Sequence, residues 1–172
     1  MIGLVMSRMI QYFGSDKRRI HHAMKVFGFS CALWSKEAEA LGLAMDDPRR
    51  ESLLIAAILH DIGIPEAERV YGSSEGRYQE IEGPPIAETM LRELGADEDL
   101  IRRVSFLIGH HHTYAAIDDL DFRILVEADL FVNLEEEKLP RENIVKARDR
   151  FMSTHGAAEL LEKYLLSGMQ MS

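Results

Sequence analysis

Apolar residues recur along most of the chain at the three- and four-residue spacing of an amphipathic helix, and no segment alternates like a strand. The pattern predicts an all-α protein without internal repeats. The expected helices are 2–13, a long one from a cap at 15–16 to about 43, 48–61, 84–94, 96–111 and 122–138, with one or two more from 140 to about 168. The intervening segment 65–83 is rich in Gly, Ser and charge, which predicts a loop with at most two helical turns.

Capping residues support three of these helix starts. Asp16 precedes the long helix, and Asp47 is followed by Pro48, an arrangement typical of a cap with proline at the first helical position. By the same criterion, Pro84 and Pro85 are expected to open their helix.

Length and charge then limit the protein class. With 172 residues, 47% of them hydrophobic, the chain is expected to form one domain, 1–172, with a substantial core. Its formal net charge of −9 argues against binding nucleic acid polymers or anionic membranes, which require a basic face. A phosphate-bearing ligand would therefore be held by local cations or metal.

Cellular location follows from what the sequence lacks. Cys31 is the one cysteine, so no intrachain disulfide can form. No apolar run approaches the roughly 20 residues of a membrane span, and the N-terminus lacks a basic leader or cleavage site. These features predict a cytoplasmic protein.

The stretch ILHDIGIP contains the first candidate chemistry. Every position of 53–59 is apolar, so this helix is expected to run through the middle of the bundle, yet it continues into His60 and Asp61. A buried carboxylate costs several kcal/mol unless it is paired or coordinated. The two residues could form hydrogen bonds within the core, or they could bind a metal.

Three other apolar helices contain polar residues of the same kinds. The long second helix contains His21 and His22, the helix over 96–111 ends in His110, His111 and His112, and the helix over 122–138 contains Glu127 and Asp129. Neutral imidazole plus carboxylate is a ligand set for Zn, Mn, Fe, Ni or Co, and the absence of cysteine ligands argues against a purely structural zinc site. A solvated histidine pair near a helix start remains the alternative for the first of these groups.

The motifs RRIHHAMKV, AAILHDIG and LVEADL, in this order, resemble the HD-domain superfamily of metal-dependent phosphohydrolases. The similarity covers about residues 18–135 and implies an all-helical HD-domain bundle. By this resemblance the metal ligands are His22, His60, Asp61 and Asp129. Together with QExEGP and HHHTY, the motifs are similar to those of a bacterial subgroup with no defined substrate.

The resemblance also bears on the number of metals. Some members hold a second metal with histidines near the end of a later helix, which here are His111 and His112. Another histidine of such members corresponds to Gln79, and glutamine is a poor metal ligand. Glu80 could substitute as an oxygen ligand. One divalent metal, Mn, Fe, Co, Ni, Zn or Mg, is therefore expected, and a second site depends on these two positions.

The implied activity is hydrolysis of a small phosphomonoester or phosphodiester, nucleotides included, by metal-activated water. Asp61 would position the water, and His111 would bind a second metal or act on the phosphoryl group or leaving group. Arg19, Arg69 and Arg77 are candidate substrate contacts, although the last two could belong to an ordinary polar loop.

Two other classes of function fit the same residues. One is a metal- or nucleotide-binding regulatory module without turnover, and the other is a di-iron oxygenase, which requires both metals. A homodimer is also compatible with the sequence, since the apolar first helix and the Met-rich tail LLSGMQMS are candidate self-association surfaces.

Overall fold

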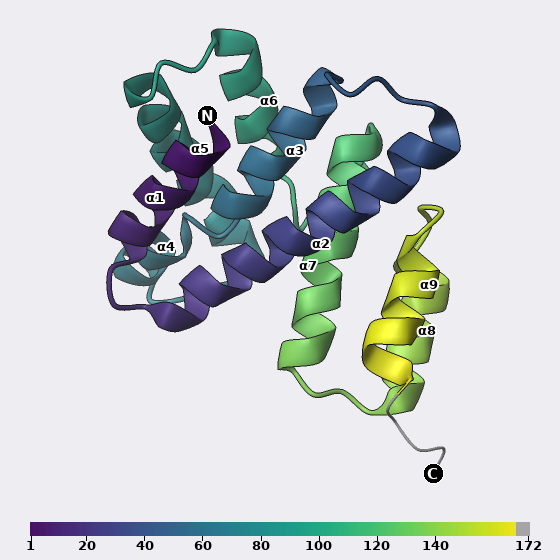
Figure 1. The fold of residues 1–172 in the computed structure, drawn as a ribbon. Helices are drawn as coiled ribbons and strands as arrows, with labels where there is room; N and C mark the ends of the chain where they lie inside the picture. Colours follow the sequence, from purple (N-terminus) through teal and green to yellow (C-terminus); the bar gives the residue numbers. More distant parts are fainter. Residues whose placement is uncertain (168–172) are drawn as a thin grey trace.

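The computed structural model describes residues 1–167, which form α-helices and two short helical turns without any strand (Figure 1). The elements are α1 (Ile2–Phe13), α2 (Lys17–Leu41), α3 (Pro48–Leu59), α4 (Ile64–Tyr71), α5 (Gly76–Glu93), α6 (Glu98–Ile108), η1 (Tyr114–Ala116), α7 (Leu120–Glu136), α8 (Arg141–Phe151), α9 (Ala157–Leu161) and η2 (Glu162–Leu166). The predicted all-α class is confirmed.

Helix α3 lies at the centre of the bundle. It contacts α1, α2, α6 and α7, and every side chain from Leu53 to Leu59 is buried. A helix covered on all sides needs apolar residues on all faces, which explains the uninterrupted apolar run. The helix ends at Leu59, so His60 and Asp61 lie in the following turn rather than within the helix as predicted.

The long helix α2 crosses the molecule diagonally, and α7 passes behind it (Figure 1). The Asp16 carboxylate accepts a hydrogen bond from the backbone N–H of Arg19 at 3.1 Å, which confirms the predicted cap. The helix ends at Leu41, where Gly42 adopts a left-handed conformation with φ 65°. The two helices meet near His22 of α2 and Asp129 of α7.

The predicted loop over 65–83 is wrong, because this segment contains α4 and the first turns of α5. Its glycines permit close helix packing. A Cβ on Gly63 would lie 2.5 Å from the backbone nitrogen of Gly83, and one on Gly83 would lie 2.6 Å from the Ile108 side chain. Tertiary contacts therefore decide a structure that the local composition disfavours.

Pro84 and Pro85 lie inside α5 instead of opening it. The helix already begins at Gly76, with Gln79 and Gly83 buried before the prolines are reached. Packing of α5 on α4 and α6 holds the helix through the two positions where proline removes an N–H donor.

The other helix boundaries lie close to their predictions. Helices α6 and α7 begin after Asp97 and Asp119, whose carboxylates accept hydrogen bonds from the first backbone N–H groups of each helix. The tail contains α8 and α9, in agreement with the expected one or two helices.

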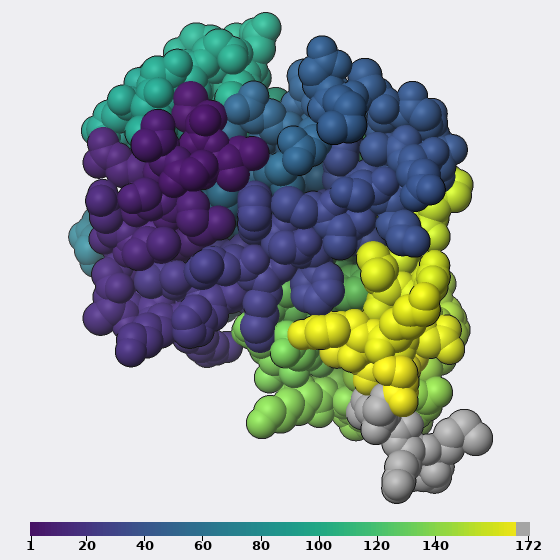
Figure 2. Space-filling model, in the orientation of Figure 1, coloured from purple at the N-terminus to yellow at the C-terminus, as the bar shows by residue number. Residues whose placement is uncertain are grey.

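The segment around α9 packs against the C-terminal part of α2, as Figure 2 shows. The buried Glu37 of α2 accepts hydrogen bonds from the backbone and ring nitrogens of His155. Residues 168–172, which include much of the Met-rich tail considered for self-association, lie outside the described part of the chain.

Within residues 1–167, none of the helices combines the length and the apolar character needed to cross a lipid bilayer.

Candidate metal centre

Three side chains from three helical segments converge at the centre of the bundle. His22 comes from α2, His60 follows α3, and Asp129 comes from α7, and all three are buried. The Nε2 atom of His22 lies 3.2 Å from Nε2 of His60 and 3.1 Å from Oδ1 of Asp129. We call these three residues the first ligand group. Two imidazole nitrogens and a carboxylate oxygen thus surround one point.

Asp61 extends the first ligand group. Its Oδ2 atom lies 3.6 Å from Nε2 of His22 and 3.5 Å from Nε2 of His60. The four residues expected to hold the metal are therefore brought together, with nitrogen and oxygen atoms facing each other.

A second ligand group, Asp61, His111 and His112, lies beside the first. Oδ1 of Asp61 is 3.9 Å from Nε2 of His111, while Oδ2 faces the first group. The His111 Nε2 atom is buried and has no hydrogen-bond partner among the described residues. Asp61 consequently lies between two sets of histidines and could bridge two cations.

The far nitrogens of the rings are held by oxygen atoms. Nδ1 of His60 lies 3.0 Å from the carbonyl oxygen of Ala57, and Nδ1 of His111 lies 2.7 Å from that of Ile108. A nitrogen facing a carbonyl oxygen must donate its proton, so each ring turns Nε2 toward the centre of its group, where this nitrogen can bind a cation once it carries no proton. This is the arrangement of a metal-ligating histidine and its supporting partner.

His22 has a carboxylate in the corresponding place. Oε2 of Glu136, near the end of α7, lies 3.4 Å from its Nδ1 atom, and Lys25 lies 3.4 Å from the other oxygen of the same carboxylate. Sequence reasoning missed Glu136 because it resembles any charged residue at the end of a surface helix.

The electrostatics of the first group favour positive charge. Burial opposes protonation of His60, but the carboxylates of Asp61 and Asp129 outweigh it and raise the pKa of His60 to about 9. Burial likewise opposes ionisation of Asp129, yet hydrogen bonds with His22 and His60 hold its pKa below the usual range. Both shifts have the same cause, an excess of negative charge that attracts a proton to His60 and keeps Asp129 ionised beside it. A metal cation among these atoms would balance that negative charge in place of the proton.

His111 shows the opposite behaviour. Burial, together with nearby His112 and His60, lowers its pKa to about 3. The ring is therefore neutral at pH 7, and its one N–H, on Nδ1, donates a hydrogen bond to the carbonyl oxygen of Ile108. Such a ring has a free lone pair on Nε2 but no proton to give to a leaving group.

The donor set fits a divalent transition metal. Imidazole nitrogens and carboxylate oxygens converge from separate helices, and the second group includes a buried nitrogen, Nε2 of His111, that has no partner among the described residues. His22, His60, Asp61 and Asp129 would hold one ion. Asp61, His111 and His112 would hold another.

Gln79 and Glu80 lie at the edge of the second group. Oε1 of Gln79 lies 3.3 Å from Nε2 of His112, while its amide nitrogen donates to the carbonyl oxygen of Ser74 at 2.7 Å. Glu80 accepts hydrogen bonds from the backbone nitrogen of His112 and the hydroxyl of Thr113, both at 3.0 Å. The contacts of Glu80 position the chain after α6 and leave its proposed ligand role as a prediction.

The three predicted arginine contacts differ in location. Arg19 lines a cavity beside the first group, whereas the exposed Arg69 pairs with Glu66 and the exposed Arg77 with Glu75. The roles of Arg69 and Arg77 in substrate binding remain predictions without a contact to either ligand group in the described chain.

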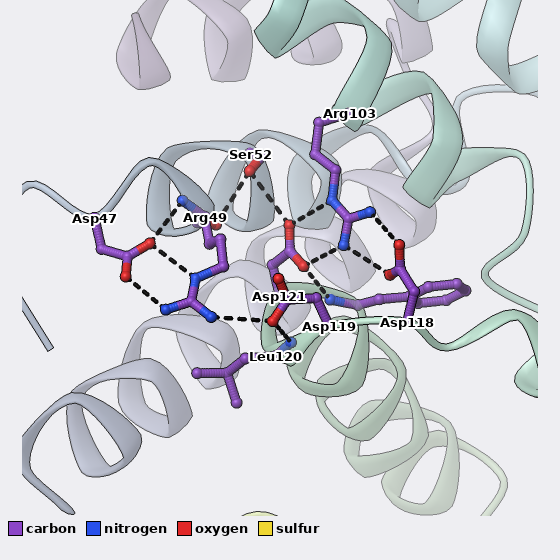
Figure 3. Close-up of polar contacts among 9 residues, drawn as sticks. Asp47, Arg49, Ser52, Arg103, Asp118, Asp119, Leu120 and Asp121 are labelled. Carbon is purple, nitrogen blue, oxygen red and sulfur yellow. Dashed lines mark hydrogen bonds and ion pairs between the residues drawn. The ribbon is translucent and has the colours of Figure 1, made fainter. Parts of the chain in front are cut away.

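Ser52, Arg103 and Asp121 form a polar cluster, here called the clasp, that links three helices on the N-terminal side of their ligand residues (Figure 3). The buried carboxylate of Asp121 accepts from Nε of Arg103 at 2.8 Å and from the hydroxyl of Ser52 at 3.4 Å. Because the clasp joins α3, α6 and α7, it fixes the longitudinal position of each helix relative to the others.

The clasp and the ligands have a common spacing. His60, His111 and Asp129 each follow a clasp residue by eight positions in the sequence. Within α7, the eight residues from Asp121 to Asp129 correspond to roughly 12 Å, slightly more than two turns, whereas His60 and His111 lie in the turns that follow α3 and α6. The clasp therefore positions three ligands at once, and sequence reasoning missed it.

Glu127, the other carboxylate noticed in α7, has a different use. It is fully buried and accepts hydrogen bonds from the backbone nitrogens of Ser153 and Thr154 at 2.7 and 3.1 Å. It attaches the turn between α8 and α9 to the bundle. This is a structural role away from the ligand groups.

An all-α bundle with a buried centre of histidine and aspartate side chains defines a class of inter-helical metal proteins. The family model of the HD domain matches residues 19–153, most of the chain. The protein therefore belongs to the HD-domain family, and the match extends beyond the predicted limit near 135 through α8. Neither the curated proteins nor the solved structures include a match to the chain.

Proposed function

We propose that this HD-domain protein is a metal-dependent hydrolase of phosphate esters. The observation that carries the proposal is the position of Asp61, whose two oxygens face His22 and His60 on one side and His111 on the other. A bound divalent cation supplies the Lewis acid that activates water and offsets phosphoryl charge.

The residues have separate roles in this proposal. His22, His60 and Asp129 bind the first cation, and Asp61 binds it and orients the attacking water. His111 and His112 bind a second cation with Asp61. His111 acts as a ligand and not as a general acid, because its pKa of about 3 leaves it neutral and its ring proton is donated to Ile108.

Metal-stripped protein, reloaded separately with Mn, Co, Ni, Zn, Fe or Mg, should hydrolyse members of a phosphate-ester panel. His60→Ala and Asp61→Asn should abolish that activity. His21→Ala is the matched control, since His21 is exposed and adjacent to His22 on α2. Equal activity of His60→Ala and the wild type would refute the assignment.

The second ligand group also supports a different chemistry, that of a di-iron oxygenase. Two irons per chain after aerobic purification, with oxygen consumption and no ester hydrolysis, would favour it. Tight metal-dependent nucleotide binding without product formation would instead indicate a regulatory module.

A further inference from the structure

A cavity of about 270 Å³ opens directly beside the first ligand group. His22 and Asp61 form its inner wall, and residues from the start of α2, from α4 and from the end of α7 form the rest. Drug-sized ligands occupy pockets of roughly 300–1,000 Å³. The cavity therefore suits a molecule smaller than these.

The lining of the cavity is polar and acidic. Asp16, Glu68 and Glu136 contribute carboxylates, Asn133 an amide, and Ile64 is an apolar contact. Apart from the His22 imidazole, the residues that line it include no aromatic ring. Proteins commonly bind nucleobases by stacking them on aromatic or guanidinium planes. This wall offers no aromatic platform, and of its two guanidinium groups that of Arg19 is ion-paired, which leaves the one of Arg18.

One carboxylate and one amide of the lining keep polar atoms without a partner among the described residues. Oε1 of Glu68 accepts from Arg19 at 2.6 Å, while Oε2 has no hydrogen bond within the described chain. The Asn133 side chain likewise forms none with residues 1–167. Acceptors of this kind, beside a small space, are complementary to a ligand with several O–H or N–H donors.

The two arginines of the wall differ in charge balance. The guanidinium of Arg19 is paired with Asp16 at 2.9 Å and with Glu68 at 2.6 Å, so its charge is matched inside the protein. Arg18 is exposed and forms no ion pair with the described residues. Arg18 is thus free to approach a phosphate at the mouth, while the acidic wall faces the remainder of the ligand.

From this lining we infer that the substrates are phosphate monoesters of small alcohols rich in hydrogen-bond donors, and that Glu68 determines this specificity. The inference rests on the proposed hydrolase function. In the reaction, the oxygen of water forms a bond to phosphorus and the bond from phosphorus to the alcohol oxygen breaks. The alcohol leaves with that electron pair and takes up a proton, so water is the only co-reactant.

Such donors could be the hydroxyls of a sugar or the ammonium group of an amino alcohol. Rates with ribose 5-phosphate and with phosphoethanolamine separate these two sources. Adenosine 5′-monophosphate tests the nucleotide alternative, and 4-nitrophenyl phosphate, which has no donor on its leaving group, reports the basal chemistry.

We expect a higher kcat/KM for at least one of the first two esters than for the nucleotide. The ratio of kcat/KM for that ester to kcat/KM for 4-nitrophenyl phosphate measures the specificity. Glu68→Ala should lower this ratio by roughly tenfold or more, because it removes one hydrogen bond to a charged group. Glu66→Ala is the matched control, since Glu66 is an ion-paired glutamate on the same helix and does not line this cavity. Its ratio should equal that of the wild type.

Preference for the nucleotide, or an unchanged ratio in Glu68→Ala, would overturn the inference while leaving the hydrolase proposal intact. Failure of every ester, 4-nitrophenyl phosphate included, with every metal would refute the proposed function and the inference with it.

Discussion

Arg103 donates two hydrogen bonds to the buried carboxylate of Asp121, at 2.8 and 2.5 Å, eight residues before the metal-site residue Asp129 on the same helix. The same guanidinium also pairs with the exposed Asp118 at 2.7 Å. One arginine therefore has a buried and an exposed partner, which allows their contributions to be compared directly.

Asp121→Asn should lower the free energy of unfolding by about 3 kcal/mol, because it removes one charge of a buried pair. It should also weaken metal binding, since the helices bearing His60, His111 and Asp129 lose their common fixed point. Asp118→Asn, the matched control, should cost less than about 1 kcal/mol and leave metal affinity unchanged. Urea unfolding and metal titration check both, and equal effects in the two variants would contradict the clasp.

Glu136→Gln should weaken the affinity for the first metal by about 10- to 100-fold, because a carboxylate that orients a ligating histidine also increases its basicity. Glu135→Gln is the control, since Glu135 contacts the same Lys25 at 3.0 Å. Competition with a metal-binding dye measures the difference. Identical affinities in the two variants would show that Glu136 does not support His22.

Glu127→Ala should destabilise the attachment of α8 and α9 by about 2–3 kcal/mol, because the backbone donors of Ser153 and Thr154 lose their acceptor. Metal affinity should be unaffected, although Glu127 is only two residues from Asp129. Hydrogen exchange should show faster opening of 153–155 without a change near 60. Loss of metal binding in this variant would mean that the C-terminal helices belong to the site.

Metal should stabilise the folded protein. At a free concentration of 100 times Kd, binding to the native state alone contributes about 2.7 kcal/mol, which corresponds to a rise in Tm of about 5–10 °C. A chelator should reverse the shift, and His60→Ala should remove it. A shift of the same size in His60→Ala would locate the binding elsewhere.

How much the sequence predicted depended on burial. His60 and Asp129 drew notice because polar residues in apolar helices require a partner, whereas the choice of His22 over His21 and the complete ligand set came from the resemblance to the HD-domain superfamily; the structure brings His22, His60 and Asp129 together. Glu136 and the clasp were not identifiable, since a glutamate, a serine and an arginine occur on ordinary helix surfaces and the sequence does not show that Glu136 is half-buried.

The helical segment over 65–83 was predicted as a loop for a similar reason. Its glycines indicate flexibility when read locally, but Gly83 packs closely against Gly63, just before the segment, which only the tertiary structure reveals. Helices with a clear apolar pattern, such as α1 and α3, were placed to within about two residues.

The central claim is that His22, His60, Asp61 and Asp129 hold a divalent metal. A crystal structure of the metal-loaded protein, with the ion identified by anomalous scattering, tests it most directly. We predict an ion about 2.0–2.2 Å from Nε2 of both histidines and from a carboxylate oxygen of each aspartate. An ion bound elsewhere, or a centre without metal in fully loaded protein, would contradict the claim.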